Sequence, residues 1–388
     1  MDSEFDDIRP YRDEEIASVL KRLSGNQMLL SGIRKKVFPR FPKLTEESLD
    51  CLVKTYFRMK LGTIRTVEQF QRKITSDVVL KRIINRTSDG LSFSGLENLE
   101  RRSPHIFISN HRDIVLDSAL LSYVVANNGF GIPVIAFGDN LMINEVVSDL
   151  IRANKAFVVK RGLPPRERIK EAYKLSRYIW HLHEKGELVW IAQREGRAKD
   201  GNDRTDKAVI KMLYLSQRKG GLSFSQYVRR VNIVPVAISY ELDPCDVLKA
   251  KELKEGAERN DREKKMQADL LSMYHGVTGH KGRVHIALGN RLQEEYQTEA
   301  DVAREIDRTI HRMYKLWPSN YIAYDEYMGS REYSSNYSSE QRSAFLRRFH
   351  EEPPAIRSRV VAMYAQPVIN RRSLMSERDE VVRALGCW

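Results

Sequence analysis

The chain has 388 residues, of which 41% are hydrophobic, so it can build a large apolar core and is not a protein disordered along most of its length. Lysine and arginine total 65 against 52 acidic residues, which gives a formal net charge of +13. This surplus suits polyanions, anionic lipid surfaces, acidic carrier proteins and phosphorylated substrates, and it does not choose among them.

The cysteines and the apolar runs narrow the class of protein. Cys51, Cys245 and Cys387 are scattered without CxxC or Cys/His spacing, so we expect neither a disulfide framework nor a metal site. The N-terminal stretch MDSEFDDIRPYRDEE is acidic, unlike a signal peptide, and the apolar runs fall short of the ~18 to 20 residues of a membrane span. We therefore expect a cytoplasmic protein, soluble or peripheral on the inner face of the membrane.

The first predicted elements are helices. Apolar residues recur at helical spacing through residues 14 to 86, which predicts an N-terminal helical bundle of three helices, followed by the turn-rich linker TSDGLSFSG. Short apolar runs then alternate with amphipathic ones. The expected strands are HIFISN, IPVIAFGD, AFVVKRG, ELVWIAQREG, VNIVPVAISYE and GRVHIALGN, and the expected helices between them are 113–128, 142–152, 165–185 and 205–219.

This alternation predicts an α/β fold, with a mixed central sheet flanked by helices, an N-terminal helical bundle and a C-terminal helical tail. Further helices are expected at 299–316 and 355–385, joined by a polar connection rich in Tyr and Ser. The predicted domains are an N-terminal helical domain (1–92), an α/β domain (93–316) and a C-terminal helical extension (317–388). We expect the extension to pack on the core; an amphipathic helix that rests on a membrane is the alternative.

A charge-rich run, KAKELKEGAERNDREKK at 249–265, follows the strand that contains VPVAISYE. Such runs are usually solvated helix faces, and this is the interpretation we favour here. A docking surface for an acidic partner is the other interpretation.

The first candidate for chemistry is His111, which lies at a predicted strand-to-helix turn with Asp113 and Asp117 after it. A neutral imidazole can take the proton of a hydroxyl that attacks a carbonyl, provided that a carboxylate fixes its other nitrogen. A solvated loop histidine, with Asp113 as the N-cap of the next helix, is the alternative.

Two basic segments follow predicted strands. Lys160-Arg161-Gly162 ends one strand and is suited to bind a phosphate or a carboxylate, although surface basic residues at a strand end are common. A second loop follows ELVWIA, and its glycine permits a tight backbone path while its cations suit an oxyanion. The residues of this loop are Arg194, Glu195, Gly196, Arg197 and Lys199.

Other motifs are either ambiguous or missing. Pro235 stands inside the apolar run IVPVAISYE and indicates a strand edge, a special bend or the start of a strand. The sequence has no GxxxxGK[ST], GxGxxG, GxSxG or HExxH, which argues against a nucleotide-binding protein, a covalent hydrolase and a zinc protease. It also has no RNP1-like motif, zinc finger or aromatic-basic interleaving, so we expect no nucleic-acid partner.

Taken in order, the NH…D turn, KRG, REGR and VPV resemble the four motif blocks of the glycerolipid acyltransferase superfamily, over roughly residues 96–300. The resemblance is closest to the bacterial and plastid glycerol-3-phosphate acyltransferases. It implies an enzyme of glycerolipid synthesis that moves a fatty acyl group from acyl-CoA or an acyl carrier protein to a hydroxyl. The implied acceptor is glycerol 3-phosphate or a lysophospholipid, the implied surroundings are an anionic membrane surface, and no cofactor is needed besides the thioester co-substrate.

The resemblance also implies roles for individual residues. His111 would be the general base and Asp117 its orienting partner. The implied substrate-binding residues are Arg112; Lys160 and Arg161, which would hold the acceptor's phosphate; Arg194, Glu195, Gly196 and Arg197 of the third block; Lys199, a further phosphate-binding cation; and Pro235, which would shape the acyl-donor site.

One departure from the family concerns spacing. The family motif has four residues between His and Asp, whereas RDIVL places five between His111 and Asp117. If the helix began directly after His111, the extra residue would rotate the carboxylate by about 100°. Asp113 is the alternative partner, but the apolar run after Asp117 aligns better with the family. Other functions considered are acylation of another lyso-lipid, such as an amino-acid lipid, and a non-catalytic module that binds anionic membranes.

Overall fold

The computed structural model describes the chain except residues 1, 28–53, 56–57, 256–261 and 385–388. The chain forms two compact units, each built from two chain segments. The first unit contains Met1–Arg82 and Ile132–Arg168, and the second contains Ile83–Gly131 and Ile169–Trp388. The domain boundaries predicted from the sequence stay a prediction.

The first unit is mainly helical and includes a pair of strands. Its elements are η1 (Asp2–Phe5), α1 (Asp13–Gly25), α4 (Val67–Phe70), the π-helical segment η2 (Gln71–Leu80), β3 (Val134–Gly138), η4 (Asp139–Leu141), α7 (Glu145–Ala153) and β4 (Ala156–Val159). The strands β3 and β4 pair in parallel. Apolar residues of α1, such as Ile16 and Leu20, pack with Phe70 and with Ala153 of α7. The middle helix predicted within residues 14–86 lies mostly outside the described residues.

The second unit contains the mixed sheet. Its strands are β1 (Leu91–Ser94), β2 (Ile106–Ser109), β5 (Val189–Ala192), β6 (Ile233–Tyr240) and β7 (Val284–Leu288), in the order β1-β7-β6-β2-β5. The neighbours are parallel except β6 and β7, which are antiparallel. All residues of β2 and β6 are buried, which explains their nearly continuous apolar sequences. The predicted mixed α/β sheet is confirmed, but β1 lies where the sequence predicted a linker.

Helices flank this sheet. They are α5 (Lys81–Thr87), α6 (Leu116–Asn127), α8 (Pro165–Glu184), α9 (Lys207–Tyr214), α10 (Phe224–Arg230), α11 (Asp246–Glu255), α12 (Arg262–Thr278) and α13 (Glu299–Met313), with the short turn η3 (Leu96–Asn98). α13 packs on β6 and on α9. The helical N- and C-terminal regions expected from the sequence are also confirmed.

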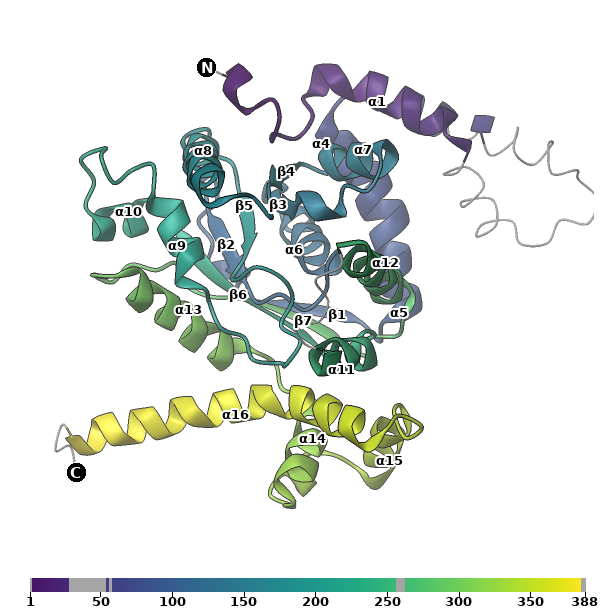
Figure 1. Cartoon of the computed structure of the whole chain (residues 1–388), viewed down its shortest axis with the longest axis vertical. Coiled ribbons are helices and arrows are strands. Elements are labelled where there is room, and N and C mark those ends of the chain that lie inside the picture. Colours follow the sequence, from purple (N-terminus) through teal and green to yellow (C-terminus); the bar gives the residue numbers. More distant parts are fainter. Residues whose placement is uncertain (1, 28–53, 56–57, 256–261, 385–388) are drawn as a thin grey trace, which may run out of the picture. The chain divides into compact units, whose positions relative to one another are not determined.

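The C-terminal region contains more helices than the sequence predicted. Two helices, α14 (Pro318–Met328) and α15 (Ser339–Arg347), together with the short turn η6 (Ser334–Asn336), occupy the stretch predicted to be a polar connection. They pack with α16 (Pro354–Ala384) around a shared apolar cluster that includes Ile322, Phe345 and Val360 (Figure 1). α16 also contacts α11 and α13, so the C-terminal helices pack against the α/β part of this unit.

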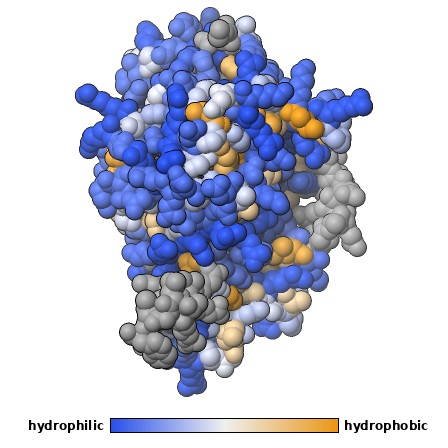
Figure 2. Space-filling model, turned by 90° about the vertical axis from the view of Figure 1, so that its left-hand side faces the viewer, coloured by the Kyte–Doolittle hydropathy of each residue, from blue (hydrophilic) through white to orange (hydrophobic). Residues whose placement is uncertain are grey.

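Two observations concern membrane association: the hydropathy of the described helices and the hydropathy of one face of the surface. None of the helices in the described part of the chain has the length and hydropathy needed to cross a bilayer. On the face drawn in Figure 2, hydrophilic side chains predominate and hydrophobic ones form small separate spots.

A close backbone contact joins the loop after β5 to α16. Pro367 lies inside α16 and has no N–H to donate to the carbonyl four residues earlier, that of Met363. Gly201 packs against that carbonyl so closely that an added Cβ would stand 2.1 Å from its oxygen. Only glycine fits here, because the backbone of Gly201 also has a positive φ of 76°.

We predict that Gly201→Ala destabilises the protein by about 1–3 kcal/mol more than Gly221→Ala. Gly221 is the matched control, since it has a similar φ of 84° but nothing within 4 Å of its added Cβ. Both substitutions incur the left-handed backbone strain, and only the first meets the Met363 carbonyl. The difference is measured by urea unfolding; equal losses of stability would show that the contact is not tight.

Candidate active site

The candidate site is built around the turn that joins β2 to α6. β2 ends at Ser109, and α6 begins only at Leu116, so residues 110–115 form a non-helical turn. Within it, Nδ1 of His111 lies 2.9 Å from Oδ2 of Asp117, the second residue of α6. Four of the five intervening residues lie in this turn and only Leu116 is helical, so the turn takes up the extra residue and the carboxylate is not rotated away from the imidazole.

The carboxylate of Asp117 is fully buried and held by several donors. Its Oδ2 also accepts the backbone N–H groups of Arg112, at 2.6 Å, and Asp113, at 2.9 Å. Its Oδ1 accepts the hydroxyl of Tyr240 at 2.9 Å, from the end of β6. Its position in the first turn of α6 adds the favourable end of the helix dipole. The pKa of Tyr240 is raised well above 10, mainly by burial and secondly by the charge of Asp117, so this hydroxyl keeps its proton.

The side chain of Asp113 has a different structural role, at the start of α6. Its Oδ1 accepts the backbone N–H groups of Val115 and Leu116, which satisfies the start of α6. Its other oxygen packs against Gly276 of α12, where an added Cβ would stand only 2.1 Å away. Burial, together with the charge of Asp117, raises the pKa of Asp113. The carboxylate that contacts the imidazole is therefore that of Asp117.

The imidazole of His111 is held by a carboxylate at Nδ1 and has no protein hydrogen-bond partner at Nε2 among the described residues. The side chain is 12% exposed, and the edge of its ring meets Trp190 of β5 at a centroid distance of 5.9 Å. Since the carboxylate accepts at Nδ1, the proton of the neutral ring lies there and Nε2 keeps its lone pair. In the described part of the chain no protein group hydrogen-bonds Nε2. This arrangement can accept a proton at Nε2 and stabilise the imidazolium through Asp117.

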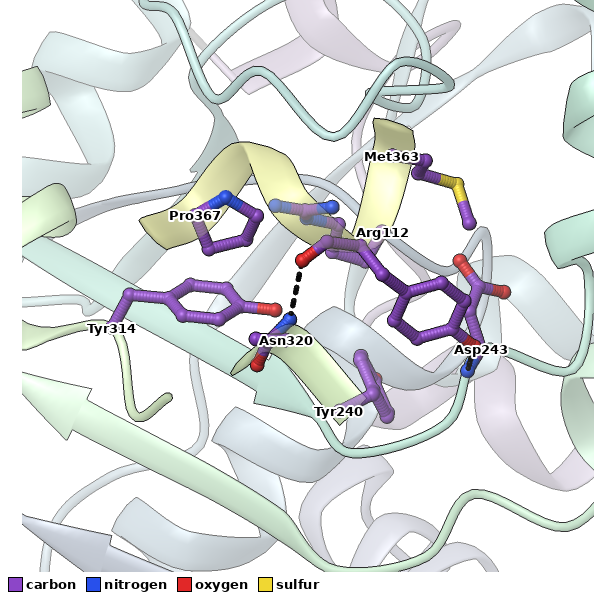
Figure 3. A pocket seen from close by; sticks show the side chains of 8 residues that line it. Arg112, Tyr240, Asp243, Tyr314, Asn320, Met363 and Pro367 are labelled. Atoms are coloured by element: carbon purple, nitrogen blue, oxygen red, sulfur yellow. Dashed lines mark hydrogen bonds between the residues drawn. The ribbon is translucent and has the colours of Figure 1, made fainter. Parts of the chain in front are cut away.

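Arg112 lies beside the dyad but points into the protein. Its Nη2 donates to Asp203 Oδ2 at 2.6 Å and to the carbonyl of Gly201 at 3.0 Å. Burial lowers the pKa of Arg112, but the charge of Asp203 and further groups outweigh burial, so the net shift is upward. Asn110 also donates to Asp203, at 3.1 Å. The guanidinium, predicted to bind substrate, thus forms a buried ion pair and lines a cavity with Tyr314 (Figure 3).

The loop after β5, which contains the residues of the third motif block, lies next to the turn after β2. The N–H of Ala198 donates to the carbonyl of His111 at 2.8 Å, which joins the loop after β5 to the turn after β2. Gly196 adopts a φ of 73°, as expected for a tight backbone path. Arg194 is half-buried and Glu195 exposed.

The cations of this loop face carboxylates. Arg197 is buried, with its Nη2 3.7 Å from Glu252 of α11 and 3.6 Å from Asp269 of α12. Lys199 lies 2.6 Å from Glu252. Within the described residues, no group of His, Cys, Asp or Glu side chains is arranged to hold a metal ion. Arg197 and Lys199 are groups that could hold an anion in exchange for these carboxylates.

The remaining predicted residues lie elsewhere. Lys160 and Arg161 belong to the first unit, where Lys160 pairs with Asp7 at 2.7 Å and the N–H of Arg161 donates to Asp139. Their part in the site stays a prediction.

Pro235 lies in β6, which is an inner strand of the sheet. The interpretation of Pro235 as the mark of an edge strand was therefore wrong. It pairs in register with Ile108 of β2, and the antiparallel ladder to β7 begins one residue later, at Val236. The missing N–H therefore falls just before that ladder, which is why an inner strand tolerates the proline.

Sequence reasoning missed several residues that support the dyad. Tyr240, Asp203 and Trp190 contact Asp117, Arg112 and His111 across long stretches of chain. A weak signal existed for Tyr240, because a polar residue ends an otherwise apolar strand beside β2. Asp203 stands in a loop of many polar residues, and nothing in the sequence distinguishes it.

Comparisons with known proteins find similarity to acyltransferases. Residues 90–239 match the family model described as Acyltransferase. The dihydroxyacetone phosphate acyltransferase of Mus musculus is 28% identical over 151 residues, 38% of this chain and 20% of that protein. The glycerol-3-phosphate acyltransferase of Pseudomonas syringae pv. tomato is 31% identical over 169 residues, 42% of this chain and 19% of that protein.

Residues 90–239 are thus similar to the acyltransferase family, and the predicted resemblance to the glycerolipid acyltransferases is confirmed. The aligned region spans about a fifth of the length of these two relatives. A crystal structure of the 1-acyl-sn-glycerophosphate (LPA) acyltransferase PlsC from Thermotoga maritima aligns with 76% of this chain and 91% of its own. Its sequence identity of 13% and TM-score of 0.36 are too low to support an argument.

We predict that Asp117→Asn abolishes the strongly downfield proton resonance expected from the His111 Nδ1–H bond to a carboxylate, because an amide accepts more weakly than a charged oxygen. Asp113→Asn is the matched control and should keep the resonance, since the side chain of Asp113 accepts the backbone N–H groups of Val115 and Leu116 and not the imidazole. One-dimensional proton NMR of both variants makes the measurement. Loss of the signal in Asp113→Asn alone would contradict the assignment of the partner.

Proposed function

We propose that the protein transfers a fatty acyl group from a thioester to the hydroxyl of a phosphate-bearing glycerolipid precursor. The proposed acceptor is glycerol 3-phosphate or a lysophospholipid, and the donor is acyl-CoA or an acyl carrier protein. The observation that carries the proposal is the His111–Asp117 pair, in which a buried carboxylate holds Nδ1 and no described protein group hydrogen-bonds Nε2. The relatives are named as acyltransferases of dihydroxyacetone phosphate and of glycerol 3-phosphate, which supports the choice of a phosphate-bearing acceptor.

The proposed reaction uses His111 as a general base. Its Nε2 removes the proton of the acceptor hydroxyl as the oxygen attacks the thioester carbonyl. The carbon–sulfur bond then breaks, the new ester forms, and the proton passes from the imidazolium to the leaving thiolate. Asp117 stabilises the imidazolium between these steps. The acyl group passes directly from donor to acceptor, without a covalent bond to the protein.

We propose that Arg197 and Lys199 bind the acceptor's phosphate; a phosphate-binding role of Lys160 and Arg161 stays a separate prediction from the sequence. A phosphate dianion forms strong charge-assisted hydrogen bonds with such groups. Because Arg197 and Lys199 now face Glu252, a bound phosphate would compete with that carboxylate.

The surface charge suits the proposed partners. A formal net charge of +13 attracts anionic membranes, anionic acceptors and an acidic carrier protein. The hydrophilic character of the face in Figure 2 fits attraction by charge better than insertion into the bilayer. We therefore propose that the protein works in the cytoplasm, at the inner surface of the membrane.

The proposed reaction is tested with purified protein, acyl-CoA and acyl-carrier-protein donors, and a panel of acceptors. The panel contains glycerol 3-phosphate, dihydroxyacetone phosphate, lysophospholipids and a lyso-form of an amino-acid lipid. We expect thioester cleavage that depends on a phosphate-bearing acceptor, and a fall of roughly 10²–10⁴-fold in kcat for His111→Ala. Unchanged turnover of His111→Ala would remove this residue from the mechanism, and no cleavage with any pair of substrates would overturn the proposed function.

The phosphate assignment is tested by two substitutions with opposite expected effects. Arg197→Ala should raise KM for a phosphate-bearing acceptor about tenfold or more, because a charge-assisted contact is lost. Glu252→Gln should lower that KM, because the competing carboxylate loses its charge. Steady-state kinetics at saturating donor measures both effects. If Arg197→Ala changed only the KM of the donor, Arg197 would not be a phosphate ligand.

A further inference from the structure

The charge-rich run 249–265 contains a lysine that is not solvated. Lys249, in the first half of α11, is 0% exposed. Two residues along the same helix, the side chain of Lys251 is 45% exposed and pairs with Glu352. The sequence predicted a solvated helix face for the whole run, and that prediction is wrong for Lys249.

The ammonium group of Lys249 reaches the candidate active-site turn. Its Nζ donates to the backbone carbonyl of Arg112 at 2.6 Å and pairs with Asp243 Oδ2 at 2.5 Å. Arg112 directly follows His111. The carbonyl that Lys249 binds belongs to the peptide group between Arg112 and Asp113.

The other end of that same peptide group contacts Asp117. The N–H of Asp113 donates to Asp117 Oδ2 at 2.9 Å. Because a trans peptide group is planar, an anchor on its oxygen also fixes the direction of its N–H. A positive charge on the oxygen further polarises the peptide and strengthens the bond that its N–H donates. Lys249 is thus linked to the carboxylate that orients His111 through one rigid group.

A second set of contacts holds the partner of Lys249. Burial alone would raise the pKa of Asp243, but the charge and hydrogen bond of Lys249 outweigh it, so this carboxyl stays ionised. The backbone N–H of Asp243 donates to the hydroxyl of Tyr364 in α16 at 2.6 Å, and this hydroxyl donates to Asp246. Figure 3 shows Asp243 and Arg112 on the wall of the same cavity, with Met363 and Pro367 of α16.

The energetics of the pair favour a role in positioning over one in stability alone. A buried ion pair often contributes no more to stability than apolar residues of similar size, because both charges lose their hydration. The turn of residues 110–115, which contains His111 and the anchored peptide group, is not helical. A longer irregular turn needs more external support to keep one conformation.

We propose that Lys249 is a positioning residue for the dyad. It holds the Arg112–Asp113 peptide so that its N–H meets Asp117, and the carboxylate then stays in line with Nδ1 of His111. The effect on turnover rests on the proposed function, whereas the effect on the hydrogen bond does not.

The test uses Lys249→Met, which keeps the length of the side chain but removes its charge and donor, with Lys251→Met as the matched control. We expect Lys249→Met to lower kcat by about tenfold or more while KM for donor and acceptor stays within about twofold. The downfield Nδ1–H resonance of His111 should weaken or disappear. Lys251→Met should keep the kcat, both KM values and the resonance of the unsubstituted protein.

A double variant separates positioning from folding. Lys249→Met alone leaves the charge of Asp243 buried without Lys249, which lowers stability. Lys249→Met with Asp243→Asn removes both charges and should recover the urea midpoint, but neither kcat nor the resonance. If the double variant recovered kcat and the resonance together with stability, Lys249 would be structural only and the proposal would be overturned.

The two proposals fail in different ways. If the unsubstituted protein cleaved no thioester, the proposed function would fall, while the NMR comparison of Lys249→Met with Lys251→Met would still test the positioning. If acyl transfer were normal in both lysine variants and the resonance unchanged, the proposed function would stand and the role of Lys249 would fall.

Discussion

The buried carboxylate of Asp117 is the interaction on which the candidate site depends. An ionised carboxylate without contact to water is stable only when donors surround it. These donors come from the turn after β2, from the imidazole of His111 and from Tyr240 at the end of β6. The parallel pairing of β2 with β6 brings the carboxyl ends of both strands to one edge of the sheet, so the fold itself brings these donors together.

The sequence predicted the strands whose residues are buried on both faces, because such strands have nearly continuous apolar runs. It missed β1, whose sequence LSFS is mostly exposed and has the composition of a turn. It also missed α14 and α15, where tyrosine and serine obscure the apolar spacing. The signals that delimit these helices were nevertheless present, since Pro318 opens α14 and Ser338 forms a capping box with Gln341 at α15.

The site could be predicted from the sequence only where its residues are neighbours in the chain. His111, Asp113 and Asp117 are close neighbours in the chain, and the resemblance to the family favours Asp117 over Asp113 as the partner of His111. The supporting contacts connect Tyr240 to Asp117 over 123 residues and Lys249 to Arg112 over 137. Such contacts arise from the packing of the folded chain, and no local sequence pattern predicts them. Lys249 in particular stands in a run of charged residues that are similar in sequence but differ in burial.

The central claim is that Nε2 of His111 takes the proton of the acceptor hydroxyl. A crystal structure with a phosphate-bearing acceptor and a non-reactive thioester analogue tests it most directly. The dyad predicts the acceptor hydroxyl within about 2.6–3.2 Å of Nε2, on the side of the imidazole away from Asp117, and facing the thioester carbonyl. An acceptor whose hydroxyl faces the thioester but lies out of reach of Nε2, directly or through one water, would contradict the claim.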